Sequence, residues 1–161
     1  MKILIFIIII IISILSFIYN KDECDILNLA RNYIKKTKDD WNYILPSDFF
    51  SKYYPDLEKN KNTDFILIDL RDSESFNKFH VKNAINIFWL NLLDENNLKK
   101  LPKDKKIFLI CYVGHTSSQA LVLLKCLGYD VVSIKFGYGI SPNPNVEVLG
   151  WAKLQYPLIN S

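Results

Sequence analysis

The stretch KIFLICYVGHTSSQAL, residues 106–121, decides the fold and draws attention to one thiol. An apolar run ends at Cys111, a short polar loop with one glycine follows, and an apolar-periodic segment then begins. This pattern predicts a buried strand, a turn and a helix. In open parallel α/β sheets, ligands bind at the carboxyl ends of the strands, which is where Cys111 would lie. Because a helix start favours a thiolate over a thiol, Cys111 is the candidate nucleophile.

The start of the helix after Cys111 has its own signals. Thr116 and Gln119 match the S/T-x-x-E/Q capping box, which predicts Thr116 as the N-cap. Gly128 is expected to end the helix. Gly114 can adopt backbone angles that are closed to other residues, so successive amides can converge on one point. The competing interpretation is a small buried cysteine that only packs at a strand end.

The N-terminus carries an apolar segment that inflates the hydrophobic content of the 161-residue chain to 50%. Residues 3–18 are almost wholly apolar, which is typical of a membrane anchor or a signal-peptide core over residues 1–20. Phe17, Ile18 and Tyr19 are bulky where signal cleavage needs small residues, so an uncleaved transmembrane helix is favoured. Cleavage as a signal would make the protein secreted.

Charges on either side of this segment bear on its orientation. Lys2 precedes it, whereas Lys21 is followed at once by Asp22 and Glu23. The positive-inside tendency places the domain on the extracytoplasmic side, in the periplasm or at the cell surface. A thiol-dependent site in such a space needs reducing input.

Composition excludes several other classes. The net charge is +3, from 20 basic and 17 acidic side chains, and nothing indicates a nucleic-acid surface. The three cysteines and two histidines lack the spacing of a metal site, so no metal or cofactor is expected. Cys126 is expected to pack within the helix after the loop, and Cys24 is expected to be incidental.

The remainder of the chain alternates between short apolar strands and helical segments. A linking helix over Asp25–Asp40, within residues 21–42, is predicted to lead to a domain at residues 43–161. Strands are expected at Tyr43–Leu45, Phe65–Asp69, Ala84–Ile87, Ile107–Ile110 and Val131–Ile134, with helices from Pro46 to Tyr54, from Ser73 to before His80, around Leu90–Leu93 and after Cys111. This alternation predicts an α/β fold whose parallel sheet is covered on both faces.

Two regions resemble the rhodanese-like (sulfurtransferase) domain, over about Tyr43–Tyr138. The first is IDLRDSESFNKFHVKNAINI, residues 68–87, which is similar to the family's D-x-R…F…G-H-I-x-G-A-x-N-I-P stretch. The second is the Cys111 loop together with LLKCLGYDV, residues 123–131. The resemblance implies a five-stranded parallel sheet flanked by helices, with the active loop at the strand ends.

The chain departs from the family pattern at several positions. Phe79 and Asn83 replace glycines, and Phe88 stands where proline is common. Many rhodaneses carry arginines in the loop that attract anionic donors, whereas here Thr116 occupies an arginine's usual place. A subgroup of single-domain rhodaneses has a similar C-Y-x-G-H-T loop.

The resemblance implies a sulfurtransferase in which Cys111 carries sulfur as a persulfide. The donor would be thiosulfate, a polysulfide or a persulfide, the acceptor a thiol, and a reductant or a sulfur-carrier protein is a possible partner. Asp69 and Arg71 would either shape the pocket rim or act as structural support, with Arg71 paired to an acid such as Glu74. The expected substrate-binding residues are Tyr112, Val113, Gly114, His115, Thr116 and Ser117.

Two other functions compete with this one. The first is a catalytically inert rhodanese-like module that only binds a partner. The second is a phosphatase of the Cys-x₅-Arg type, which needs arginine to hold a phosphoryl dianion. Ser117 occupies that arginine position, which argues against the phosphatase.

Overall fold

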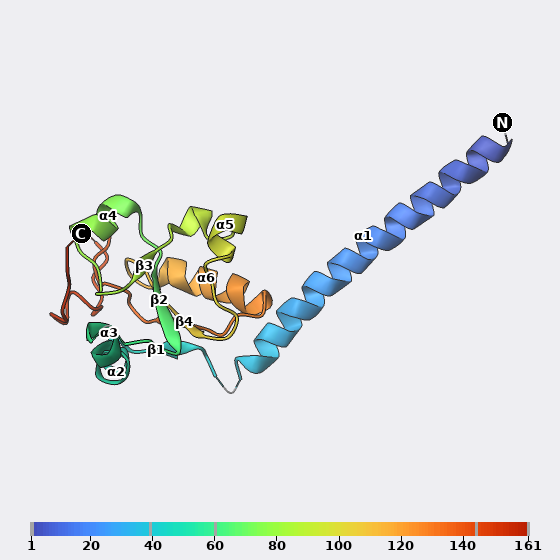
Figure 1. Cartoon of the computed structure of the whole chain (residues 1–161). Coiled ribbons are helices and arrows are strands. Elements are labelled where there is room, and N and C mark those ends of the chain that lie inside the picture. Colours follow the sequence, from blue (N-terminus) through green and yellow to red (C-terminus); the bar gives the residue numbers. More distant parts are fainter. Residues whose placement is uncertain (1, 39, 60, 144, 161) are drawn as a thin grey trace. The chain divides into compact units, whose positions relative to one another are not determined.

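The computed structural model describes residues 2–38, 40–59, 61–143 and 145–160, without the side chains of residues 2–6 and 17–24. The chain divides into two compact units, Met1–Asp39 and Asp40–Ser161 (Figure 1).

The first unit is one continuous helix, α1, at Lys2–Lys36. The sequence predicted a separate linking helix to Asp40, but the helix runs through from the apolar segment and ends at Lys36. It contains no glycine or proline that would interrupt it. Among the described residues, no helix is both long and apolar enough to cross a membrane. Residues 1–20, where the sequence predicts an anchor, lie partly outside the described residues and side chains. The side chain of Cys24 lies wholly outside them.

The second unit is built on a five-stranded parallel sheet, as predicted. The strands lie in the order β1-β5-β4-β2-β3. Their bounds are Tyr43–Ile44 for β1, Phe65–Asp69 for β2, Ile85–Asn86 for β3, Lys106–Ile110 for β4 and Val131–Ile134 for β5. β2 and β4 are neighbours in this sheet. Asp69 of β2 lies beside Ile110 of β4, so the ends of both strands meet at one edge. Cys111 follows at this edge.

Helices cover both faces of the sheet. Their bounds are Pro46–Lys52 for α2, Tyr54–Glu58 for α3, Ser73–Lys78 for α4, Trp89–Asn91 for the 3₁₀ helix η1, Glu95–Leu98 for α5 and His115–Cys126 for α6. The helix predicted from Pro46 to Tyr54 is divided at Tyr53, and Pro55, which has no amide hydrogen, lies in the first turn of α3. The segment around Leu90–Leu93 forms only the short turn η1 before α5.

Alternate residues of β4 pack into two separate cores. Ile107 and Leu109 lie in the core that includes Leu121 and Leu124 of α6. Phe108 and Ile110 lie in the opposite core, which is rich in aromatic rings. This alternation follows from the period of two in a strand. Because both faces are buried, β4 is rigidly held up to the residue that precedes Cys111.

Candidate active site

The sulfur of Cys111 lies at the carboxyl end of β4, where two backbone amides are directed at it. Its Sγ accepts hydrogen bonds from the backbone amides of Gly114 and Ser117, each at 3.3 Å. The Ser117 hydroxyl oxygen is 3.4 Å from the same sulfur. The Cys111 residue is 2% exposed. Fixed donors around a sulfur stabilise negative charge on it, as in an oxyanion site.

Gly114 turns the chain into α6. Its φ of +94° is left-handed, and α6 begins at His115. The predicted N-cap at Thr116 is therefore wrong, because the glycine starts the helix earlier and no side chain caps it. Instead, the Gly114 carbonyl accepts hydrogen bonds from the Ser117 and Ser118 hydroxyls at 3.1 and 2.7 Å. These bonds hold the carbonyl while the amide remains directed at the sulfur.

A second hydroxyl lies behind the first. Ser133 of β5 donates a hydrogen bond to the Ser117 hydroxyl oxygen at 2.8 Å, and both serines are fully buried. The hydroxyl that contacts the sulfur is thus held from two sides. Ser133 was not identified from the sequence. The available signal was a serine inside an otherwise apolar strand, because a buried hydroxyl requires a partner.

The segment after β5 holds the loop through backbone hydrogen bonds. The Tyr138 amide donates a hydrogen bond to the Cys111 carbonyl at 2.9 Å, and the Gly139 amide donates to the Tyr112 carbonyl at 3.0 Å. Gly137 passes so close that a Cβ atom built on it would lie 2.0 Å from the Cys111 carbonyl oxygen. Two backbone hydrogen bonds and this close approach fix the position of the cysteine.

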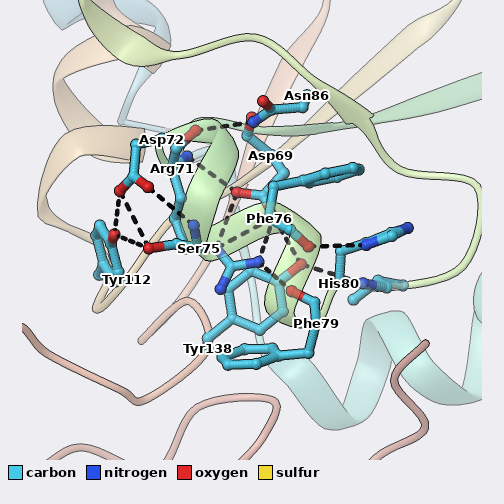
Figure 2. Close-up of polar contacts among 11 residues, drawn as sticks. Asp69, Arg71, Asp72, Ser75, Phe76, Phe79, His80, Asn86, Tyr112 and Tyr138 are labelled. Carbon is cyan, nitrogen blue, oxygen red and sulfur yellow. Dashed lines mark hydrogen bonds and ion pairs between the residues drawn. The ribbon is translucent and has the colours of Figure 1, made fainter. Parts of the chain in front are cut away.

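Asp69 and Arg71 form a buried ion pair beside the loop (Figure 2). Their exposed fractions are 0% and 1%, and the guanidinium nitrogen lies 2.7 Å from the carboxylate. Arg71 pairs with an acid, as expected, but that acid is Asp69 and not Glu74, which pairs with Lys78 at the surface. A buried guanidinium needs a buried partner, and Asp69 is the one within reach. Both residues are buried, which favours structural support over a place at a pocket rim.

Aromatic side chains complete this cluster. The Tyr138 hydroxyl donates to Asp69 at 2.9 Å, and its ring lies 3.7 Å from the Arg71 guanidinium carbon. Burial, followed by the Asp69 charge, raises the pKa of Tyr138 well above its usual range. Phe79, which replaces a family glycine, covers another face of the guanidinium at 4.7 Å. Asn83, which replaces the second glycine, keeps a left-handed φ of +61°.

Tyr112 connects the loop to α4. Its hydroxyl donates to the carboxylate of Asp72, the N-cap of α4, and also contacts the Ser75 hydroxyl (Figure 2). The hydrogen bond from Tyr112, followed by that from the Ser75 amide, lowers the pKa of Asp72 to about 2. Burial, followed by the bond to Asp72, raises the pKa of Tyr112.

The other predicted loop residues have different surroundings. Val113 and His115 line a pocket of about 310 Å³ beside the loop, together with Gly114. His115 is exposed and Thr116 is half-buried. Within the loop, Ser117 alone brings a described side chain to the sulfur. His80 lies away from the thiol, with its Nδ1 atom 3.0 Å from the Phe76 carbonyl and its ring stacked on Phe76.

Over the described part of the chain, no group of three or more His, Cys, Asp or Glu side chains is arranged to hold a metal ion.

Comparisons with known proteins relate this geometry to a family. The profile of the Rhodanese-like domain matches residues 53–139, more than half of the chain. The adenylyltransferase and sulfurtransferase uba4 of Ogataea parapolymorpha is 38% identical over 64 residues, covering 40% of this chain and 16% of that protein. The thiosulfate sulfurtransferase GlpE of Pseudomonas savastanoi is 28% identical over 74 residues, covering 45% of this chain and 68% of that protein. The match thus spans only a small part of the first relative.

Solved structures share the fold. A rhodanese-related protein of Thermoplasma volcanium superposes with a TM-score of 0.57 at 23% identity, covering 74% of this chain and 99% of that one. A protein of Bacillus halodurans superposes with a TM-score of 0.57 at 24% identity, covering 81% and 82%. The profile match, the parallel sheet and the cysteine loop at its edge agree, and the chain belongs to the rhodanese-like domain family.

Proposed function

We propose that the protein is a sulfurtransferase that carries sulfane sulfur on Cys111. The observation that carries this proposal is the pair of backbone amides, from Gly114 and Ser117, that donate hydrogen bonds to one sulfur. Such a pair stabilises a thiolate, and it stabilises equally the terminal anion of a persulfide.

The reaction has two steps. The Cys111 thiolate attacks the outer sulfur of the donor, an S–S bond forms, and the donor's own S–S bond breaks. With thiosulfate, sulfite leaves with the electron pair. A thiolate or cyanide then attacks the outer sulfur of the persulfide, and Cys111 leaves as the thiolate. The loop donors offset the negative charge at each stage, and no electron is lost to an outside oxidant.

Donors and acceptors follow from this chemistry. Thiosulfate, polysulfides and persulfides are donor classes, and a small thiol or a sulfur-carrier protein is the acceptor class. Thr116 and His115 give the loop little fixed positive charge, which favours donors other than thiosulfate.

Mass spectrometry of the intact full-length chain tests the proposal. After incubation with polysulfide or thiosulfate, we expect a gain of one sulfur atom that cyanide removes. Cys111→Ser should abolish the gain, whereas Cys126→Ser should retain it, because Cys126 lies at the end of α6 that is away from the Cys111 loop.

The alternative is an inert module that binds a partner through the same fold. A folded chain with a titratable Cys111 thiol that gains no sulfur from any donor would establish that alternative.

We also propose that residues 1–20 hold the protein at a membrane with the domain on the extracytoplasmic side. The support is the apolar run at residues 3–18 and the lysine that precedes it. Protease added to spheroplasts, in which a periplasmic or a surface domain is exposed, should remove the domain, and N-terminal sequencing should find Met1 or Lys2. A mature chain that starts after residue 20 would show a cleaved signal instead.

A further inference from the structure

We propose that the pocket beside the Cys111 loop selects organic sulfur donors that combine an apolar body with a negative charge, in preference to inorganic thiosulfate. This inference rests on the proposed function and names the substrate class of the same site. The pocket has a volume of about 310 Å³, which is enough for a small organic molecule.

Two residues that line the pocket connect it to the Cys111 site, while Cys111 itself is not part of the lining. Gly114 lines the pocket while its amide donates to the Cys111 sulfur at 3.3 Å, and glycine has no side chain to separate the two. At the base of the pocket, Ser133 donates to Ser117, whose hydroxyl oxygen is 3.4 Å from the sulfur. A donor whose body occupies the pocket therefore lies against the loop that holds Cys111.

The walls of the pocket are largely apolar. Tyr43 of β1, Val113 of the loop, Phe136 and Val148 supply them. Phe136 is 41% exposed, so a large part of its ring remains free to contact a ligand. Thiosulfate has no apolar part and gains nothing from these walls, whereas an organic group buried there is removed from water.

The backbone of Phe136 is strained. Its φ of +62° lies in the left-handed region, which bulky side chains rarely adopt. Residues held in such conformations cluster at functional sites, because the strain persists only where something else requires the residue. A half-exposed ring contributes little to the core, and its place on the pocket wall supplies a reason for its retention.

Charge favours an anion in this pocket. Lys135 and His115 are the ionisable side chains with basic groups on its lining, and none of the lining residues is acidic. Lys135 is exposed and has no ion pair within the described part of the chain. An unpaired ammonium next to apolar walls matches a ligand with an apolar body and an anionic end, such as a thiosulfonate or an organic persulfide.

The chemical step with a thiosulfonate balances without a further reagent. The Cys111 thiolate attacks the terminal sulfur of R–SO₂–S⁻, a new S–S bond forms, and the S–SO₂ bond breaks. The sulfinate R–SO₂⁻ leaves with the electron pair. Cyanide then takes the sulfur as thiocyanate, which can be measured continuously.

The test compares methanethiosulfonate with benzenethiosulfonate, which differ only in the apolar group, and includes thiosulfate as a third donor. For the full-length chain, we expect kcat/KM to be roughly tenfold higher for the benzene compound than for the methane compound, as for other small apolar groups in pockets. Phe136→Ala should bring this ratio close to one, while Phe136→Leu should retain most of it. Comparing variants cancels the intrinsic reactivity of the two donors.

A control at Leu90 and a pair of charge variants at Lys135 separate the pocket from general effects. Leu90→Ala removes an apolar side chain that is 71% exposed on η1 and should leave the ratio unchanged. Lys135→Gln should lower kcat/KM for both thiosulfonates and weaken its dependence on salt, since screening acts on the lost charge. Lys135→Arg should restore both values, which a merely structural role would not require.

The outcomes distinguish the two proposals. If the chain forms a persulfide but Phe136→Ala leaves the donor ratio unchanged, the pocket inference is overturned and the sulfurtransferase stands. If no donor adds sulfur to Cys111, the proposed function fails, and the inference fails with it.

Discussion

The Tyr112 hydroxyl donates a hydrogen bond to the Asp72 carboxylate, and this bond ties the residue after the candidate nucleophile to the first turn of α4. Asp72 also accepts from the Ser75 amide at 2.8 Å, so one carboxylate both caps a helix and holds the loop. The contact crosses between segments 40 residues apart in the chain. It therefore fixes the loop through a contact separate from those made by the supporting segment at Gly137–Gly139.

Tyr112→Phe removes only the hydroxyl of this contact. We expect the free energy of unfolding to fall by about 1 kcal/mol, because a partly exposed hydrogen bond to a charged group is lost. Persulfide formation should slow several-fold, since the loop gains freedom next to Cys111. Urea unfolding and single-turnover sulfur loading measure the two effects. Tyr156→Phe, whose hydroxyl has no hydrogen bond to a described residue, is the matched control. A loading rate equal to the control's would disprove the positioning role of Tyr112.

Asp72 should make stability depend on pH in acid. Its pKa is lowered from the usual 3.8 of an aspartate to about 2, first through the Tyr112 hydrogen bond. A carboxylate with a depressed pKa contributes stability above its unfolded pKa, and this stability is lost as pH falls from about 4 toward 2. Asp72→Asn retains a capping residue but removes the charge. The wild type should exceed this variant in urea midpoint at pH 7, and the difference should disappear near pH 2. A gap that persists at pH 2 would argue against the charge as its cause.

Local patterns in the sequence were sufficient for the sheet and for the position of the nucleophile. β2 and β5 have the bounds that their mainly apolar runs predict, because strands buried on both faces are largely apolar. Cys111 was found because it ends such a run. The start of α6 was not predicted correctly, since the Thr116 and Gln119 pattern is also compatible with a glycine-initiated helix.

Contacts between distant segments were beyond local patterns. Arg71 could pair with any nearby acid as far as the sequence shows, and only burial selects Asp69 over Glu74. Ser133 contacts Ser117 because β4 and β5 are neighbours in the sheet, an arrangement that spacing along the chain does not reveal. Phe136 reaches the pocket wall because it follows β5, which is the neighbour of β4 in the sheet.

The buried pair of Asp69 and Arg71 should be costly to break. Arg71→Met leaves a buried carboxylate with the Tyr138 hydroxyl but no counter-charge, and we expect a loss of about 3–5 kcal/mol. Asp69→Asn should cost a similar amount for the converse reason. The loss of stability in the double variant should be clearly smaller than the sum of the two single losses, because no unpaired charge remains. Urea unfolding of the three variants measures this coupling, and strict additivity would show that the two side chains act independently.

Gly137 should tolerate no side chain, and Gly128 provides a matched comparison. Both have a left-handed φ, at +50° and +82°, so alanine at either position carries a backbone cost of about 1 kcal/mol. At Gly128 a Cβ atom meets nothing within 4 Å, whereas at Gly137 it would lie 2.0 Å from the Cys111 carbonyl oxygen.

Gly137→Ala must therefore displace the backbone of Cys111 or its own segment, with loss of the Tyr138 amide bond that holds the cysteine. A shift of about 1 Å at a reacting group can lower its rate on the order of 10²-fold. We expect sulfur loading to fall by that order in Gly137→Ala, and the thermal midpoint to fall well below that of Gly128→Ala. Loading should remain near the wild-type rate in Gly128→Ala. Equal loading rates in the two variants would mean that the close approach at Gly137 does not position the thiol, because strain alone is common to both.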